Sequence, residues 1–369
     1  MKVTYVCESC GAVSPVKTVS YKCACGGLYR LSYKKKRVDF QATVISREIS
    51  LFKYADALPF DKAGKPWREM SMGEGNTPLL QLHKSLYCKP DYYMPTLSFK
   101  DRGAAVLMTA AKMLGVKEAV ADSSGNAGTS IAAYGARAGI LCHIFASAAT
   151  SKKKLEQIKA HGAELHLIDG SREDVACAAI AFVEERSLFY ASHIFNPFFY
   201  EGTKTYAYEV FEQLSFSVPD VFLLPVGNGT LVLGVYLALT ELREWGYIDR
   251  MPKILAVQAS GCAPVERAFS RGEAEVSAVE NTGTAAEGIA IAAPARGKDI
   301  LSAVRETGGS VLAVTDAEIL SARAELARMG LYVETTSAAS YAAYLRLEKE
   351  TRIKEKTVVL PLCGAGLKG

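Results

Sequence analysis

Short apolar runs alternate with stretches of helical periodicity from about residue 100 to the C-terminus. Near-continuous apolar runs are typical of strands buried on both faces, and apolar positions every three or four residues are typical of helices. The predicted strands are 118–121, 140–145, 165–168, 221–226, 254–258, 311–314 and 358–362. The predicted helices are 102–114, 127–138, 151–161, 171–186, 231–245, 316–329 and 337–349, with Asp316 expected as an N-cap. The alternation predicts an α/β chain with parallel sheets covered by helices.

The first 40 residues follow a different pattern, with short strands and turns around two cysteine pairs. Cys7 and Cys10 form the first pair, Cys23 and Cys25 form the second, and glycine follows each pair. Thiolates so placed can close a tetrahedral zinc site. The alternative is a small ribbon without metal, because only one residue separates the second pair. Either way the element is expected to be structural, since four thiolates leave no open coordination position.

The composition is that of an ordinary globular protein, with 49% hydrophobic and 22% charged residues in a chain of 369. The net charge is +4, and basic residues form runs only at 34–37 and 152–154, so we expect no nucleic-acid or membrane partner. No apolar run reaches the roughly 18 residues of a membrane span, and the N-terminus lacks the apolar stretch of a signal peptide. The nine cysteines, several of them single in apolar contexts, predict a reducing cytoplasmic compartment.

One lysine stands where a loop turns into a predicted helix, in the segment 95–103. The positive end of that helix disfavours the ammonium form of Lys100, and burial would disfavour it further. Such an amine would be a nucleophile for a carbonyl group. Taken by itself, the spacing favours an ordinary surface lysine before a helix.

The segment 122–129 joins a predicted strand to a predicted helix. Its small residues allow the backbone to approach a ligand, and the N–H groups at the helix start suit a carboxylate. These residues are Ser123, Ser124 and Gly125, and Asn126 follows with an amide that can donate to an oxygen. A plain strand–helix turn is the alternative.

The segment 225–231 is a third loop, also between a strand and a helix. Gly227, Asn228, Gly229 and Thr230 offer backbone N–H groups and a hydroxyl, which suit a phosphate at the helix N-terminus. The segment is neither a Walker motif nor the full dinucleotide-binding fingerprint, so alone it is a weak signal.

Together the three segments, in this order and spacing, resemble the β family of pyridoxal-phosphate (PLP) enzymes, fold type II. The resemblance extends over most of the chain beyond residue 70. The family includes threonine synthase, the serine and threonine dehydratases, and cysteine and tryptophan synthases. The resemblance implies that Lys100 carries PLP as a Schiff base, with Phe99 beside it. It also implies that 227–230 binds the cofactor phosphate, that 123–125 binds the substrate carboxylate, and that Asn126 lies near the ring hydroxyl.

The C-terminal segment 362–368 resembles the strand end at which this family places a hydroxyl or thiol against the pyridine nitrogen. Cys363 takes that position here. A neutral partner leaves the nitrogen largely unprotonated, which favours elimination over long-lived carbanions. The alternative is a buried structural cysteine.

Several features resemble the threonine synthases within this family. The N-terminal cysteine pairs resemble a ribbon of some members, and 196–205 is similar to their N-P-x-x-x-E-G-x-K-T stretch. The segment 73–79 resembles a substrate-phosphate loop, with Thr77, and Ser98 in the lysine segment, as expected substrate contacts. The resemblance implies that the protein is a lyase, a homodimer, that converts O-phosphohomoserine to threonine and phosphate.

Three positions depart from that pattern. Met94 and Leu97 replace the asparagine and glycine of N-P-T-G-S-F-K-D-R, and Ala365 stands where a histidine is common. The segment 286–289 is closer to the dehydratases. Elimination from serine, threonine or diaminopropionate therefore stays open, as does β-replacement on O-phosphoserine of the cysteate synthase type.

Two non-enzyme alternatives also stay open. One is a zinc-ribbon nucleic-acid binder with an inactive α/β body, and the other is a PLP-binding regulatory module without chemistry.

The resemblance implies two three-layer, parallel-sheet domains of fold type II in addition to the ribbon. We expect the ribbon at 1–34, a large PLP-binding domain at 35–112 and 196–369, and a small mobile domain at 113–195. The active site is expected between the two larger domains.

Overall fold

The computed structural model describes residues 3–16, 21–60 and 64–368. The chain divides into two compact units. Unit 1 comprises Met1–Gly75 and Lys100–Gly202, and unit 2 comprises Asn76–Phe99 and Thr203–Gly369. The bounds of these units differ from the domain bounds expected at 34, 112 and 195, so that division stays a prediction.

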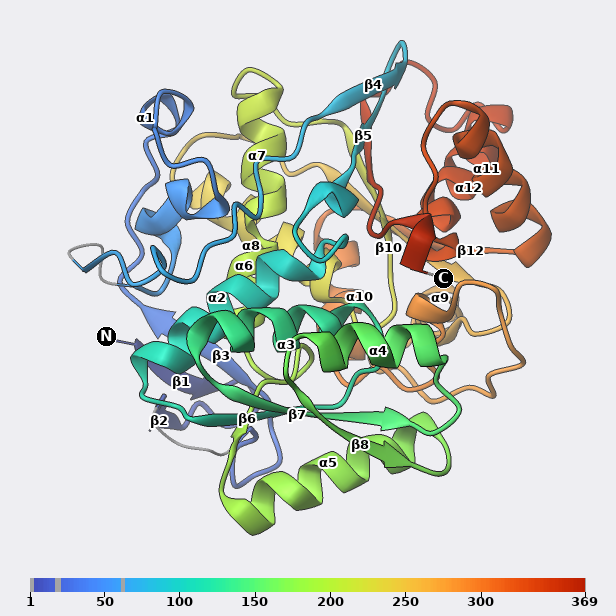
Figure 1. Cartoon of the computed structure of the whole chain (residues 1–369). Coiled ribbons are helices and arrows are strands. Elements are labelled where there is room, and N and C mark those ends of the chain that lie inside the picture. Colours follow the sequence, from blue (N-terminus) through green and yellow to red (C-terminus); the bar gives the residue numbers. More distant parts are fainter. Residues whose placement is uncertain (1–2, 17–20, 61–63, 369) are drawn as a thin grey trace. The chain divides into compact units, whose positions relative to one another are not determined.

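The main sheet of unit 1 is parallel, in the order β8-β7-β6-β9. Its strands are β6 (Glu118–Ala121), β7 (Leu141–Ser147), β8 (Glu164–Ile168) and β9 (Phe189–Tyr190). Helix α5 (Arg172–Arg186) covers one face, and α3 (Asn126–Ala138) and α4 (Lys152–Ala160) lie on the other (Figure 1). All of these elements fall within 113–195.

The N-terminal ribbon is an antiparallel sheet in the order β2-β1-β3. Its strands are β1 (Val3–Cys7), β2 (Val13–Pro15) and β3 (Tyr29–Tyr33). The apolar face of this sheet joins the same buried cluster as α2 (Lys100–Met113), and the Tyr5 ring packs edge-on against Phe198 at 6.4 Å. The ribbon is therefore part of the core of unit 1.

The sheet of unit 2 runs in the order β12-β11-β10-β13-β5-β4. Its strands are β4 (Leu80–His83), β5 (Leu86–Lys89), β10 (Val221–Pro225), β11 (Lys253–Ala259), β12 (Ser310–Val314) and β13 (Val358–Pro361). All neighbours are parallel except the edge strand β4, which is antiparallel to β5. The predicted α/β class with parallel sheets is thus confirmed, with an antiparallel edge that the apolar pattern does not predict.

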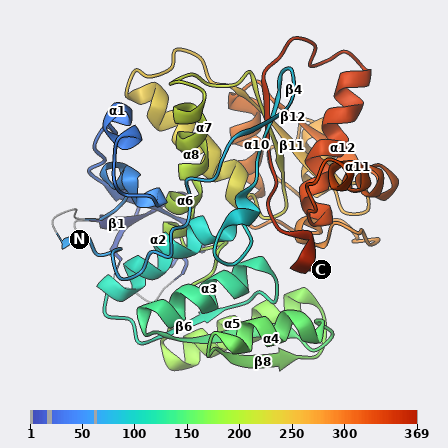
Figure 2. The ribbon, with the colours of Figure 1, turned by 45° about the horizontal axis from the view of Figure 1, so that its top comes forward.

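Helices lie on both sides of this sheet. Helices α11 (Asp316–Arg328) and α12 (Thr335–Lys349) pack side by side on one face, and α8 (Thr230–Glu244) and α10 (Gly297–Glu306) lie on the other (Figure 2). The helices not yet given bounds are α1 (Phe40–Val44), α6 (Phe198–Thr203), α7 (Thr205–Gln213) and α9 (Pro264–Ser270). Short 3₁₀ turns occupy Leu51–Ala57, Asp91–Tyr93, Glu287–Ile289 and Gly366–Lys368.

The predicted helix 316–329 begins where α11 (Asp316–Arg328) begins, but the residue expected as its N-cap is wrong. The N-cap of α11 is Thr315, not Asp316. The Thr315 hydroxyl accepts the Glu318 N–H at 3.3 Å, and the Glu318 carboxylate accepts the Thr315 N–H at 2.7 Å. This reciprocal capping box satisfies donors that Asp316, already inside the helix, could not reach in the same way.

Among the helices of the described residues, none is long and apolar enough to cross a membrane.

Candidate active site

Three neighbouring strands of unit 2 end in the segments that the sequence singles out. In the order β10-β13-β5, the strands are parallel, so their carboxyl ends lie at the same edge of the sheet. Strand β10 leads into 227–230, β13 leads into Cys363, and β5 leads into the segment before Lys100. Ligands of open α/β sheets bind outside this edge.

The lysine segment is hydrogen-bonded to the end of β13. The Phe99 N–H donates to the Cys363 carbonyl at 2.8 Å, and Ser98 forms a bridge with Gly364. Ser98 is fully buried, and its hydroxyl has no hydrogen-bond partner among the residues described. A buried hydroxyl without a partner is costly, so this oxygen is suited to a bound polar group. The predicted residues Ser98, Phe99 and Cys363 thus come together, and Lys100 follows directly in the chain.

Leu97 has a left-handed backbone at the position where the resembling motif has glycine. Its φ is +61°, and its side chain is 37% exposed. Its carbonyl accepts the Ala365 N–H at 3.1 Å, and its own N–H donates to the Met94 carbonyl at 2.8 Å. The turn before Lys100 therefore keeps a glycine-like conformation in spite of the leucine, at a cost in strain.

The loop after β10 forms the N-terminus of the fifteen-residue helix α8. Gly229 is the N-cap, has φ of +79°, and provides no side-chain cap to the first N–H groups. A Cβ at Gly227 would meet Ile291 Cγ1 at 2.9 Å, so glycine lets this loop pack closely against the segment 288–291. Thr230 is buried and begins the helix, and Asn228 is half-buried. This arrangement fits a phosphate group.

Lys100 is the first residue of α2 and lies close to two aromatic rings of unit 1. Its Nζ is 5.6 Å from the centroid of the Phe199 ring. Burial lowers the pKa of His193 well below its usual value, and the positive charges of Lys100 and Arg172 lower that pKa further. His193 is therefore a buried, neutral imidazole near the positive charge of Lys100.

Two glycines allow α2 to pack closely against the segment that carries Phe199. A Cβ on Gly103 would lie 2.3 Å from the Phe199 ring, and a Cβ on Gly202 would lie 2.0 Å from the Arg102 carbonyl oxygen. The ring can approach Lys100 because neither glycine has a side chain.

The turn at 123–126 begins helix α3. Its N-cap is Gly125, without a side-chain cap, so the first N–H groups of the helix face the turn. Ser123, Ser124, Gly125 and Asn126 are all half-buried. The Ser130 hydroxyl, one helical turn farther on, donates to Asp101 at 2.7 Å and ties α3 to the residue after Lys100.

Asp122 precedes this turn and is a buried carboxyl group. Burial raises its pKa, against the opposing effects of Tyr190 and Arg172. Its Oδ1 has no hydrogen-bond partner among the described residues. Sequence reasoning missed Asp122, as it missed His193; the short polar residue that ends an apolar strand was the available signal for Asp122.

Thr77 is anchored in unit 2. Its hydroxyl donates to Asp91 at 2.7 Å, and its carbonyl accepts from Lys89 at 2.8 Å. Lys89 also forms a fully buried ion pair with Glu209 at 2.8 Å. A hydroxyl has one hydrogen, so a substrate contact by donation from Thr77 would require that hydrogen to leave Asp91. That contact stays a prediction.

The four cysteines of the ribbon converge. The Sγ–Sγ distances are 3.5 Å for Cys7–Cys25 and Cys10–Cys25, and 3.7 Å for Cys10–Cys23. Four sulfurs at about 2.3 Å from a tetrahedral zinc ion lie roughly 3.8 Å apart. The geometry fits zinc.

Comparison with known proteins places this architecture in a family. A family described as pyridoxal-phosphate dependent enzyme matches residues 70–364. The threonine synthase of Methanocaldococcus jannaschii is 34% identical, over 98% of this chain and 92% of that protein. The threonine synthase of Mycobacterium tuberculosis is 35% identical, over 85% of this chain and 87% of that protein.

Solved structures share the fold. The processed form of threonine deaminase isoform 2 from Solanum lycopersicum aligns with a TM-score of 0.69 and 21% identity, over 83% of this chain and 85% of that one. A PLP-dependent aspartate racemase aligns with a TM-score of 0.70 and 22% identity, over 82% of this chain and 94% of that one. The chain therefore belongs to the pyridoxal-phosphate-dependent enzymes of fold type II, as a lyase related to the threonine synthases.

Proposed function

We propose that this protein is a threonine synthase, which converts O-phosphohomoserine and water to threonine and inorganic phosphate. The observation that carries the proposal is the gathering of 227–230, Cys363 and the lysine segment at the carboxyl ends of β10, β13 and β5. The identity of 34–35% to threonine synthases supports the choice of substrate within the family.

In this proposal, Lys100 binds the PLP aldehyde, and the backbone N–H groups of 227–230 hold its phosphate with the Thr230 hydroxyl. When bound, PLP withdraws electrons from the substrate Cα and so acidifies its proton. Phe99 would pack beside the cofactor, Asn126 would orient the ring hydroxyl, and the Cys363 thiol would be the partner of the pyridine nitrogen. Cys363 is buried, and a thiol rather than a carboxylate at this position suits a ring nitrogen that stays unprotonated.

The remaining assignments concern the substrate. The turn formed by Ser123, Ser124 and Gly125 receives the substrate carboxylate at the start of α3. Ser98 contributes its buried hydroxyl. The Lys100 amine takes the proton from Cα and moves a proton at Cβ, in a site from which water is excluded except for the molecule consumed.

The experiment is an assay of the purified PLP-loaded protein with O-phosphohomoserine, in which phosphate and threonine are measured together. Equal amounts of both products support the proposal. Ammonia and a 2-oxo acid from serine, threonine or diaminopropionate, without threonine synthesis, would instead favour a dehydratase. Phosphate from O-phosphoserine but not from O-phosphohomoserine would favour β-replacement.

We also propose that Cys7, Cys10, Cys23 and Cys25 hold a structural zinc ion. The convergence of the four sulfurs supports it. Metal analysis of protein purified without added zinc tests it: a zinc content lower by one per chain in Cys10→Ser than in the wild type supports the site, and an unchanged zinc content in that variant contradicts it. The homodimer stays a prediction that light scattering can test.

A further inference from the structure

A second cluster of metal-ligand side chains lies on the parallel sheet of unit 1. His143 on β7 is in register with Glu164 on β8, and Phe145 is in register with His166. Paired residues of parallel strands, and residues two apart on one strand, point to the same face. His143, Glu164 and His166 therefore project from one face of the sheet.

Their ligand atoms converge on one point. His143 Nδ1 is 3.2 Å from His166 Nε2 and 3.2 Å from Glu164 Oε2. Two ligand atoms of a tetrahedral zinc ion, each about 2.0–2.1 Å from the metal, lie roughly 3.3 Å apart. The spacing is thus that of a metal-ligand set, from two imidazoles and one carboxylate.

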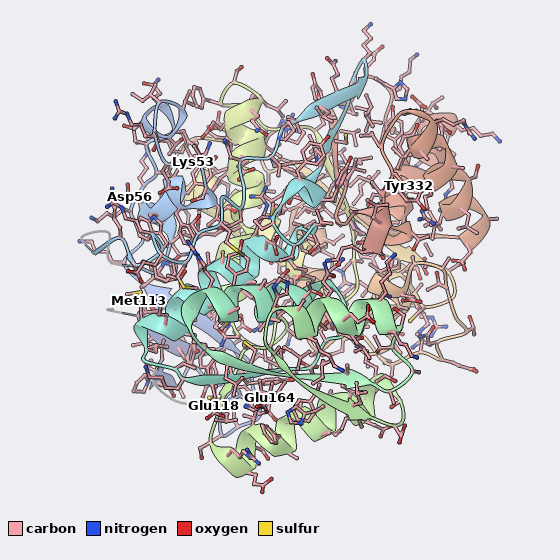
Figure 3. The ribbon with its side chains drawn as sticks, viewed as in Figure 1. Lys53, Asp56, Met113, Glu118, Glu164 and Tyr332 are labelled. Carbon is pink, nitrogen blue, oxygen red and sulfur yellow. The ribbon has the colours of Figure 1, made fainter. Side chains whose placement is uncertain are left out.

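The other nitrogen of His143 has its own partner. His143 Nε2 is 3.0 Å from Glu118 Oε2 on β6. Figure 3 labels Glu118 and Glu164 near each other on this sheet. Glu118 approaches His143 Nε2, and Glu164 approaches His143 Nδ1. A carboxylate on the distal nitrogen is the usual orienting partner of a metal-bound histidine, because it holds the proton there and leaves the other lone pair for the metal.

If Glu118 holds the His143 proton at Nε2 and the His166 proton is on Nδ1, three acceptors face each other. With its proton on Nε2, the His143 ring presents a lone pair at Nδ1 to the Glu164 carboxylate. A proton on His166 Nε2 can be donated to His143 Nδ1. It does not satisfy the contact between His143 Nδ1 and the Glu164 carboxylate. A divalent cation satisfies all three at once.

Packing holds the two rings in place. Phe145 stacks on His166 at 4.4 Å between centroids, and Phe182 of α5 lies 5.1 Å from both imidazoles. The His143 side chain is 4% exposed, whereas that of Glu164 is 58% exposed. The ligands are therefore preorganised, with one side open to solvent as an entry path and for a water molecule. The Arg186 guanidinium lies 4.4 Å from the Phe182 ring centroid and is a positive charge that would repel a bound cation. The two carboxylates of Glu118 and Glu164 oppose that repulsion.

We propose that His143, Glu164 and His166 form a binding site for a divalent transition-metal ion, Zn²⁺ by ligand type, with Glu118 as the residue that orients His143. Two imidazoles and a carboxylate suit zinc, and the fourth position is left for water. The ion would link β7 to β8, and through Glu118 to β6. The site is separate from the ribbon cysteines and does not depend on the proposed function.

The test is calorimetric titration of the full-length, PLP-loaded protein with Zn²⁺ alone. We expect one binding event that is lost, or weakened at least tenfold, in His166→Gln and in Glu164→Gln. Glu164 is exposed, so its variant leaves the core of the sheet intact. Glu118→Gln should weaken the same event by about 10–100-fold. His83→Gln, which changes an exposed histidine of β4, is the matched control.

The Cys10→Ser variant distinguishes zinc binding at the ribbon from zinc binding at His143, Glu164 and His166. It should leave the second event unchanged. If the wild type, His166→Gln and Glu164→Gln bind the same number of zinc ions with the same affinity, the proposal is wrong. The imidazoles would then be joined only by an N–H···N hydrogen bond.

Discussion

The side chain of Lys100 combines two environments in one residue. Its backbone begins α2, where the helix N-terminus disfavours a positive charge, and its amine lies over the Phe199 ring, which attracts one. The two effects oppose each other.

Lys100→Ala should remove the covalent attachment of PLP and reduce turnover by at least about 10²–10⁴-fold, because the amine is also the proposed base. Borohydride treatment followed by mass spectrometry measures the attachment, and a steady-state assay measures turnover. Lys112→Ala, at the last turn of the same helix and partly exposed, is the control and should behave like the wild type. Turnover at the wild-type rate in Lys100→Ala would remove the assignment.

Leu97→Gly should increase the free energy of unfolding by about 0.5–1 kcal/mol. A left-handed backbone costs a non-glycine residue roughly 1–2 kcal/mol, and glycine removes that cost. About 0.4–1 kcal/mol of the gain is lost again, because glycine gives the unfolded chain more conformational freedom. Denaturant unfolding measures the change. Leu97→Ala keeps a Cβ, and so the strain, and should show no such gain. A Leu97→Gly protein less stable than the wild type would show that the leucine side chain stabilises the turn by more than the strain costs.

Among the secondary-structure elements, α3 depends on the absence of one side chain. A Cβ on Gly128 would lie 1.7 Å from the Ser123 carbonyl oxygen, which is a backbone atom and cannot rotate away. The helix and the turn before it are therefore fitted to each other. A change in the first turn of α3 must move the turn at 123–126.

Gly128→Ala should lower the free energy of unfolding by about 1–3 kcal/mol, as overpacking does, and reduce kcat/KM by up to about 10²-fold through misplacement of the turn. Thermal unfolding and steady-state kinetics measure the two effects. Gly64→Ala makes the same chemical change where a Cβ meets nothing within 4 Å, and should change neither quantity. If Gly128→Ala keeps full kcat/KM, the turn does not contact the substrate.

For the protein as a whole, the ribbon matters because it shares a core with α2. Tyr5, Tyr29 and Leu31 of the ribbon belong to the same buried cluster as Val106 and Phe199. Cys7 ends β1, and the other three cysteines lie in the loops that connect the strands of this small sheet. Loss of the metal there should loosen a part of the core of unit 1, and not merely a terminal appendage.

Cys25→Ser should therefore lower the thermal midpoint of the protein by several degrees. For a protein of this size, each kcal/mol of lost stability corresponds to about 2–4 °C. Differential scanning calorimetry of the zinc-loaded protein measures the shift. Cys177→Ser, at an exposed free thiol of α5, should leave the midpoint unchanged. An equal midpoint in both variants would mean that the ribbon holds without metal.

Much of the fold can be predicted from local pattern. The predicted strand 118–121 has the bounds observed for β6, and 221–226 agrees with β10 to within one residue, because a run of apolar side chains buried on both faces has few other solutions. The edge strand β4 is missed, since its residues alternate between half-buried and exposed over a short span. The cap of α11 is displaced because both Thr315 and Asp316 are good N-caps, and only backbone geometry distinguishes them.

Local sequence is enough to establish the type of most elements, the loops that carry chemistry and the family. Periodicity and glycine placement are local properties of the chain, so they can be recognised before the chain is folded. Two further features appear only in the folded protein. Strand β13 lies between β10 and β5, which brings Cys363 to Phe99, and β7 pairs with β8 in the register that joins His143 to His166. Strand order and register arise from hydrogen bonds and buried faces between segments far apart in the chain, and no local pattern encodes them.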